Sequence, residues 1–358
     1  MYRNVKHVPY YIFGKGSLAQ LGDLLPERRK TQGAGVVFFI DHFFRDGALA
    51  TRLPVGQGDR IIYVDVTEEP TTDYMDVLAA QVRAGDAALP CCMVALGGGA
   101  TMDACKAVAN LLTNPGLAED YQGWELVKNP PVYKIAVPTL AGTGSECSRT
   151  CVLSNVKKRL KLGMNSDHTV FDQVIMDPEL TRSVPRDQFF HTGMDTYMHC
   201  FETLTGSYRN RIVDALAEKA VAMCEDVFLS DDMMSEVNLE KMMIASYLGG
   251  MATGYVGVVH PFSAGLSVAL HMRHGIANCY ALTVLEDIYP EHHATFLRML
   301  ERQKVVLPKG VCRNLRAEDY EVLYAGTIVH ENSLSNRLGP DFAKILSKEN
   351  VIERFKRM

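Results

Sequence analysis

The first half of the chain alternates short, continuous apolar runs with amphipathic segments. We predict strands at residues 10–13, 35–40, 61–64, 92–96 and 135–137. Between them we predict a helix near Leu18 with Ser17 as its N-cap, a helix over residues 73–84 and one that begins near Thr101. Continuous apolar strands that alternate with amphipathic helices are typical of a parallel sheet that is covered on both faces.

The pattern changes after Asp177-Pro178, where strand-like runs give way to helical ones. We predict helices over residues 211–228, 238–253 and 264–269, and a basic helix over residues 352–358 at the end of the chain. Pro178 and Pro185 flank a polar connector. The sequence therefore predicts an α/β domain with a parallel sheet over residues 1–180 and an all-helical domain over residues 181–358.

Composition excludes several classes of protein. A length of 358 residues suits two domains, and 47% hydrophobic with 22% charged residues is ordinary for a soluble protein. A net charge of -5 argues against a nucleic-acid or membrane-surface partner. No run of about 20 apolar residues is present, and the N-terminus lacks the apolar segment of a secretory signal. We expect a cytoplasmic protein whose nine cysteines are reduced and mostly buried.

Two glycine-rich loops directly follow predicted strands. Gly97-Gly98-Gly99 ends one strand and opens a helix, and Pro138 to Glu146 follows the next strand. Residues without a Cβ let a phosphate approach the backbone, and a helix N-terminus offers free N–H groups. Tight turns also use such residues, so each loop alone is weak evidence. Ligands of parallel sheets bind at the carboxyl ends of the strands, which favours a phosphate-bearing ligand here.

Candidate metal ligands lie in the second half. Asp195 and His199 are four residues apart in a predicted helix, so their side chains share one face. His260 and His274 follow, about four helical turns apart, on one bent helix or on a helix and the turn after it. Gly275 fits a helix C-cap. One carboxylate and three imidazoles suit Fe(II) or Zn(II), although an isolated Asp/His pair is more often a surface carboxylate beside a half-buried histidine.

Taken together, these motifs resemble the metal-dependent, iron-type (group III) alcohol dehydrogenase family. The order and spacing agree from about residue 8 to residue 285. Four stretches carry the resemblance: Gly97 to Asp103 with Lys106, Pro138 to Glu146, Gly193 to Glu202, and His260 to Gly275.

The resemblance implies a fold and a set of site residues. It implies an N-terminal dinucleotide-binding domain, an all-helical metal-binding domain and an active site in the cleft between them, the fold that dehydroquinate synthase shares. The implied metal ligands are Asp195, His199, His260 and His274. The implied cofactor-binding residues are Asp41, Gly97, Gly98, Gly99, Asp103, Thr139, Thr143 and Lys161. A carboxylate at Asp41 accepts hydrogen bonds from a ribose 2′-hydroxyl and repels a 2′-phosphate, which favours NAD.

Two positions depart from the family pattern. Many members carry a histidine four residues after the third ligand, where this chain has Ala264. We expect His271 or water to carry the proton instead, unless His271 merely packs. Arg273 stands before His274 where proline is common, and it could pair with a substrate carboxylate or simply be solvated. Lys106 and Lys161 could neutralise phosphate or substrate charge, or lie on the surface.

The resemblance implies metal-assisted oxidation of a primary alcohol to an aldehyde, with hydride transfer to a nicotinamide. Within the family, the chain is similar to enzymes that oxidise the C8 hydroxyl of 3-deoxy-D-manno-octulosonate in lipopolysaccharide biosynthesis. Other hypotheses remain open: a generic NAD-dependent alcohol dehydrogenase, oxygen as the final acceptor, a dehydroquinate synthase-like lyase, and a non-catalytic binding protein. The sequence does not choose between iron and zinc. A homodimer is expected from symmetry frequencies alone.

Overall fold

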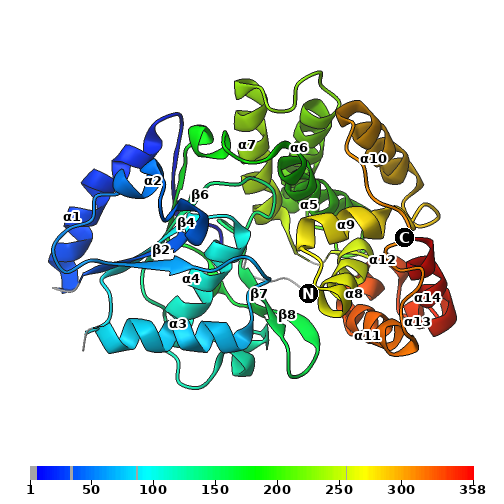
Figure 1. The fold of residues 1–358 in the computed structure, drawn as a ribbon, viewed down its shortest axis with the longest axis horizontal. Coiled ribbons are helices and arrows are strands. Elements are labelled where there is room, and N and C mark those ends of the chain that lie inside the picture. Colours follow the sequence, from blue (N-terminus) through cyan, green and yellow to red (C-terminus); the bar gives the residue numbers. More distant parts are fainter. Residues whose placement is uncertain (1–5, 33–34, 86–87, 255) are drawn as a thin grey trace. The chain divides into compact units, whose positions relative to one another are not determined.

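A six-stranded sheet forms the centre of the N-terminal unit (Figure 1). The computed structural model describes residues 6–32, 35–85, 88–254 and 256–358. Every pairing found in this sheet is parallel, and the strand order is β1-β9-β6-β4-β2-β3. The strands are β1 (Tyr10–Phe13), β2 (Val36–Asp41), β3 (Arg60–Val64), β4 (Cys92–Gly97), β6 (Lys134–Pro138) and β9 (Gln173–Met176).

Helices cover both faces of this sheet, as the continuous apolar strands predict. Figure 1 shows α1 on one side of the strands and α3 and α4 on the other. Along β2, Val36, Phe38 and Ile40 belong to the hydrophobic cluster that includes Leu21 and Leu25 of α1. The alternate residues of β2 point to the opposite face and are buried as well. The helices of this unit are α1 (Leu21–Gln32), α2 (Ala48–Thr51), α3 (Thr72–Gly85) and α4 (Gly99–Leu111).

The start of the first helix differs from the prediction. A 3-10 helix (Ser17–Gln20) precedes α1, and the Ser17 hydroxyl donates to the Met176 carbonyl, so it does not cap a helix. The capping acceptor is the Asp177 carboxylate, which accepts hydrogen bonds from the Gly16 and Leu18 amides. The capping residue is therefore distant in the sequence although it is close in space, so the local sequence cannot reveal it.

A second, three-stranded sheet was missed by the sequence analysis. It has the order β5-β8-β7 and consists of β5 (Gly123–Trp124), β7 (Thr150–Asn155) and β8 (Leu160–Asn165). Buried and partly exposed residues alternate along β7, and only two of the six residues of β8 are buried. These strands lack the long apolar runs that identified the strands of the larger sheet.

The C-terminal unit is helical. The boundaries of the two units interleave, because residues 141–144 and 158–161 group with residues 183–358. Side-chain caps start several helices: Asn210 accepts from the Ile212 amide at the start of α6, and Ser235 from the Asn238 amide at α7. The helices are α5 (Arg186–Thr205), α6 (Arg211–Phe228), α7 (Glu236–Ala252), α8 (Val259–Leu270), α9 (His274–Leu282), α10 (Pro290–Gln303), α11 (Ala317–Ile328), α12 (Glu331–Leu338), α13 (Phe342–Ile345) and α14 (Lys348–Arg357).

The long helices agree closely with the predictions, and the cysteines do too. The helix predicted over residues 211–228 is α6, and α7 begins two residues before its predicted start. All nine cysteines are unpaired and buried. Within the described part of the chain, no helix is long and apolar enough to span a membrane.

Small residues allow close contact between α8 and α11. A Cβ on Gly265 would lie 2.7 Å from the Leu323 carbonyl oxygen and 2.7 Å from the Thr327 hydroxyl oxygen. A Cβ on Gly326 would lie 3.1 Å from the Gly265 Cα. Because α8 carries one of the candidate metal ligands, this contact fixes the position of that ligand.

We predict that Gly265→Ala lowers the free energy of unfolding by about 1–3 kcal/mol, because the methyl group has no room between α8 and α11. Chemical denaturation measures the change. Gly22→Ala is the matched control, since Gly22 lies in α1 with open space around it. Alanine there should leave stability unchanged or raise it by up to about 1 kcal/mol. Equal effects of the two substitutions would contradict the tight packing.

Candidate metal centre and glycine-rich loops

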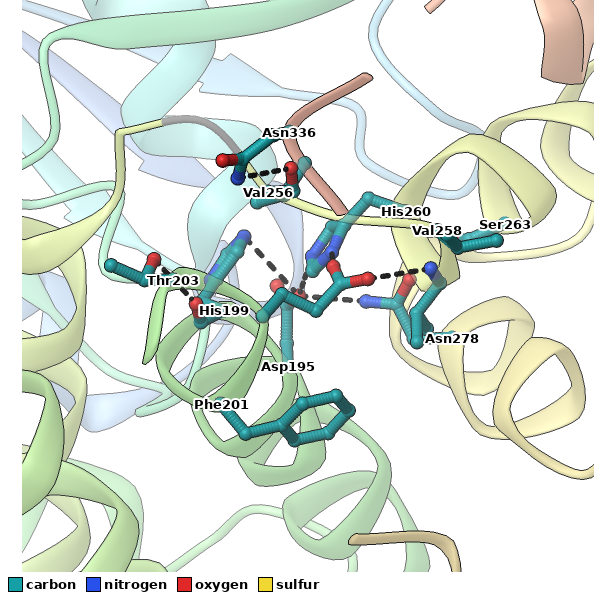
Figure 2. A network of polar contacts seen from close by, with 12 residues as sticks. Asp195, His199, Phe201, Thr203, Val256, Val258, His260, Ser263, Asn278 and Asn336 are labelled. Atoms are coloured by element: carbon teal, nitrogen blue, oxygen red, sulfur yellow. Dashed lines mark hydrogen bonds and ion pairs between the residues drawn. The ribbon is translucent and has the colours of Figure 1, made fainter. Parts of the chain in front are cut away.

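Four side chains from three helices of the C-terminal unit converge on one point. Asp195 and His199 come from α5, His260 comes from α8, and His274 is the first residue of α9. One ligand atom from each lies within 4.8 Å of the others. Figure 2 shows Asp195, His199 and His260 directed toward one another. The structure thus brings together all four residues that the sequence analysis proposed as metal ligands.

The geometry of the four atoms suits a tetrahedral ion. The Asp195 Oδ1 atom lies 3.6 Å from Nε2 of His199, 3.1 Å from Nε2 of His260 and 3.4 Å from Nε2 of His274. Metal–ligand bonds of 2.0–2.1 Å in a tetrahedron place neighbouring ligand atoms about 3.4 Å apart. All three imidazoles therefore present the same ring nitrogen at the distance that such an ion requires.

Burial and missing partners also favour a bound cation. The Asp195 side chain is 1% exposed, and its Oδ2 atom is buried without a hydrogen-bond partner among the described residues. An ionised carboxylate in such a place requires a compensating positive charge. The His274 side chain is 29% exposed, which leaves one side of the cluster open to a further ligand. Imidazole and carboxylate donors suit Fe(II) and Zn(II) alike.

Neighbouring polar side chains orient two of the ligands. The Asn278 amide donates to Asp195 Oδ1 at 2.7 Å, and the Ser263 hydroxyl oxygen lies 3.2 Å from Nδ1 of His274. Both Asn278 and Ser263 are fully buried. Sequence analysis missed them, although Asn278 stands four residues after His274, on the same face of α9. Such partners fix the orientation of metal-binding residues.

The cluster shifts the pKa values of its members in opposite directions. Burial lowers the pKa of His199 to about 4, so this ring is neutral at pH 7. Burial alone would raise the pKa of Asp195, but the surrounding histidines hold it well below its usual range. Burial also opposes a charge on His260, yet its hydrogen bonds to Asp195 and Glu202 raise its pKa to about 9. The carboxylate is thus ionised and ready to bind a cation.

The segment between His260 and His274 is neither one bent helix nor a helix followed by a turn, the two arrangements that the sequence left open. The chain leaves α8 at His271, which has φ 53° and ψ 29°, and α9 begins at His274. Gly275 is therefore inside a new helix and is not a C-cap. A Cβ on Gly275 would lie 2.9 Å from the His191 carbonyl oxygen, so glycine lets α9 approach α5.

The two candidate catalytic residues lie in this same link. His271 and Arg273 are both exposed, and Arg273 occupies the N-cap position of α9. Ala264 is buried in α8, four residues after His260. Ala264 has no group that can transfer a proton, so a proton route at this metal centre must use another residue or water.

The first glycine-rich loop joins β4 to α4 in the N-terminal unit. Gly97 ends β4, Gly98 is the N-cap of α4, and Gly99 is its first residue. A Cβ on Gly97 would lie 2.4 Å from the Thr101 hydroxyl oxygen and 3.0 Å from the Asp41 Cβ. Asp41, the last residue of β2, therefore lies beside the glycines, and its carboxylate also accepts from the Phe43 amide. The backbone at the start of α4 can bind a phosphate.

Asp103 and Lys106 hold the same helix in place. Lys106 is fully buried, and its ammonium group donates to the Ser145 and Ser148 hydroxyls and to the Thr150 carbonyl. Asp103 accepts from the Ser145 hydroxyl and from the amide of Val152. Burial lowers the pKa of Lys106 and raises that of Asp103. Lys106 is thus not a surface residue; it fastens α4 to the segment after the second loop.

The second loop divides between the two units. In the N-terminal unit, Thr139 follows β6, and its amide donates to the Gly97 carbonyl at 2.9 Å. In the C-terminal unit, the amides of Gly142 and Gly144 donate to the Ser246 hydroxyl of α7. The hydroxyl of Thr196, the residue after Asp195, donates to the Gly142 carbonyl. Thr143 is therefore held between α5 and α7.

Lys161 also groups with the C-terminal unit. It lies in β8 and is 5% exposed, so it is not a surface residue.

We predict that His199→Ala weakens the binding of Zn(II) or Fe(II) by more than about 100-fold. Loss of a hydrogen-bond partner of a metal ligand typically costs roughly 10–100-fold in affinity, and here a ligand itself is lost. Metal content after dialysis, determined by mass spectrometry, measures the effect. His271→Ala removes an exposed histidine close in sequence to His274, so it should retain the metal of the parent. Undiminished metal in His199→Ala would contradict the assigned centre.

Comparisons with known proteins agree with this arrangement. A family model described as iron-containing alcohol dehydrogenase matches residues 9–178, and the C-terminal model of the same family matches residues 189–320. Sulfoacetaldehyde reductase of Bilophila wadsworthia is 32% identical over 222 residues, which cover 60% of this chain and 56% of that protein. The match thus spans little more than half of that relative. The probable alcohol dehydrogenase EutG of Escherichia coli is 28% identical, with 92% of this chain and 82% of that protein covered.

Solved structures share the fold over the whole length. Sulfoacetaldehyde reductase from Bifidobacterium kashiwanohense, in complex with NAD+, has a TM-score of 0.81 at 23% identity, with 99% of this chain and 98% of that chain covered. Alcohol dehydrogenase from Oenococcus oeni has a TM-score of 0.82 at 22% identity and covers 99% of each chain. The two family models together match most of the sequence, on both sides of the domain boundary. The chain therefore belongs to the iron-containing alcohol dehydrogenase family.

Proposed function

We propose that this protein is a metal-dependent oxidoreductase that oxidises a primary alcohol to an aldehyde. The observation that carries the proposal is the cluster of Asp195 with three histidines, whose ligand atoms lie at the spacing of a tetrahedral ion. Related proteins are named sulfoacetaldehyde reductase, NAD-dependent methanol dehydrogenase and 1-propanol dehydrogenase. Each of these names refers to a primary alcohol or an aldehyde.

The residues of this chain have distinct roles in such a reaction. Asp195, His199, His260 and His274 would hold the ion. When bound, a divalent metal supplies a Lewis acid that lowers the pKa of an alcohol, and a nicotinamide supplies the hydride acceptor. The glycines of the β4–α4 loop let a pyrophosphate approach the N-terminus of α4. The partly exposed side of His274 is where a substrate hydroxyl can reach the cluster.

We infer that the nicotinamide cofactor is NAD. Asp41 stands at the carboxyl end of β2, where its Cβ lies beside Gly97. A carboxylate in this place binds the two ribose hydroxyls and repels a 2′-phosphate. A structure with the same fold was solved with NAD+ bound, which supports the same choice.

We propose a sugar acid as the substrate, specifically the C8 hydroxyl of 3-deoxy-D-manno-octulosonate. Two features support an anionic substrate. Arg273 is exposed and adjoins His274, so its guanidinium group can pair with a carboxylate beside the metal centre. A relative that shares 32% identity is named for an aldehyde with a sulfonate group. With Ala264 in place of a proton-carrying group, we assign the proton transfer to His271 or to water.

Anaerobic turnover of metal-loaded protein with this sugar acid tests the proposal. With NAD present, we expect aldehyde and NADH to form in equal amounts. Aldehyde that forms only with oxygen, together with peroxide, would retain the metal centre but replace NAD as the final acceptor. Sugar acid consumed without an oxidised product would indicate a lyase. No turnover of the sugar acid, but oxidation of neutral primary alcohols, would contradict the substrate assignment alone.

We predict that Asp41→Asn shifts the ratio of kcat/KM for NAD to that for NADP by about tenfold or more toward NADP. The substitution removes a charged hydrogen-bond acceptor, worth about 1.5–3 kcal/mol, and a charge that repels phosphate. Asparagine retains an oxygen for the Phe43 amide, so the local turn should persist. Asp23→Asn, an exposed carboxylate in α1, is the control and should leave the ratio unchanged. An unaltered ratio in Asp41→Asn would refute the role of Asp41.

A further inference from the structure

Glu202 is a buried carboxylate beside the metal centre that is not one of its four ligands. It lies on α5, three residues after His199, and is fully buried. Its Oε2 atom lies 2.5 Å from Nδ1 of His260. Its Oε1 atom accepts hydrogen bonds from the Val259 amide at 2.6 Å and from the Tyr289 hydroxyl at 3.0 Å. Every oxygen of this carboxylate thus has a donor.

The contact with Glu202 decides which ring nitrogen of His260 carries a proton. An ionised carboxylate only accepts hydrogen bonds, so Nδ1 of His260 must be the donor. The opposite ring nitrogen, Nε2, faces Asp195 Oδ1 at 3.1 Å, and this is the atom that would bind the ion in place of a proton. Metal-binding histidines require this tautomer, and a carboxylate partner also makes the ring a stronger ligand.

The contacts described for the other two histidines are of a different kind. His274 lies beside a neutral hydroxyl, that of Ser263. The Nδ1 atom of His199 is buried without a hydrogen-bond partner in the described part of the chain. Glu202 supplies a second buried negative charge in addition to that of Asp195. When an ion is bound by neutral histidines, these two negative charges balance those of one divalent cation, which limits the cost of burying all three ions.

The backbone segment before His260 packs closely against Glu202. A Cβ on Gly257 would lie 2.1 Å from the Tyr289 hydroxyl oxygen and 2.8 Å from Glu202 Oε1, so only glycine fits there. The Tyr289 hydroxyl also accepts from the Val258 amide at 2.9 Å. Figure 2 shows the Asn336 amide bonded to the Val256 carbonyl. The segment that leads into His260 is thus fixed by side chains from three different helices or loops.

We propose that Glu202 is a positioning residue of the metal centre, which keeps a proton on Nδ1 of His260 and supplies negative charge that strengthens the binding of a divalent ion. This inference depends on the metal site of the proposed function and extends it to a residue outside the ligand set. It assigns to Glu202 an effect on metal affinity that a merely structural carboxylate would not have.

Metal titration of the full-length, metal-free protein tests the proposal. The probe is Co(II), followed by its visible spectrum and by competition with a chromophoric chelator. Glu202→Gln preserves the shape of the side chain but removes its charge, and we expect affinity to fall about 10–100-fold with an altered Co(II) spectrum. Asp214→Asn is the matched control, because Asp214 is a buried carboxylate of the same unit that pairs with Arg209. Its affinity should stay within about twofold of the parent.

The outcomes separate positioning from structure. Unchanged affinity in Glu202→Gln, or an equal loss in Asp214→Asn, would overturn the proposal. Should Glu202→Gln fail to fold, Tyr289→Phe replaces it: loss of one hydrogen bond to Glu202 should weaken Co(II) binding about fivefold, and parental affinity would overturn the proposal. The Co(II) titration contains no alcohol and no nucleotide, so its result does not depend on turnover. A protein that binds metal but oxidises no alcohol would contradict the proposed function and leave the role of Glu202 intact.

Discussion

The helical unit depends on one buried, ionised oxygen atom. Asp195 Oδ1 lies where burial penalises a charge, so its surroundings must supply positive or hydrogen-bonding groups. The Asn278 amide donates to this oxygen, and three imidazoles from α5, α8 and α9 surround it at the spacing of ligands to a bound cation. The close approach of α9 to α5 at Gly275 lets these groups converge, and Gly265 packs α8 against α11. The packing of α5, α8 and α9 and the chemistry of the cluster are therefore linked, because these helices must approach closely to surround the Asp195 carboxylate.

In the glycine-rich loops, several residues of each motif hold the loop itself in place. In the N-terminal unit, Asp103 and Lys106 hold α4 against the segment that follows the second loop, while Asp41 and the glycines lie at the strand ends. In the C-terminal unit, Thr196 ties the Gly142 carbonyl to α5 at the residue next to Asp195. Some residues of each motif therefore stabilise the loop, and a role in cofactor binding is proposed for the others.

Regular patterns in the sequence predicted most of the fold, and the family resemblance identified the four residues that the structure brings together. The errors have physical causes. Strong periodicity identified α6 and α7, and i, i+4 spacing placed Asp195 and His199 on one face of α5. Gly275 was misassigned because the left-handed turn at His271 starts a new helix. The roles of Glu202, Ser263 and Asn278 depend on contacts across 11 to 83 residues, which spacing along one helix cannot reveal.

We propose that a single divalent ion is bound by three imidazole nitrogens and one carboxylate oxygen. X-ray absorption spectroscopy of the metal-loaded protein tests it most directly, because nine buried cysteines offer an alternative set of sulfur ligands. We expect nitrogen and oxygen neighbours at about 2.0–2.1 Å from the metal, together with scattering from the more distant atoms of three imidazole rings. Sulfur at about 2.3 Å, or scattering from fewer than three imidazoles, would contradict it.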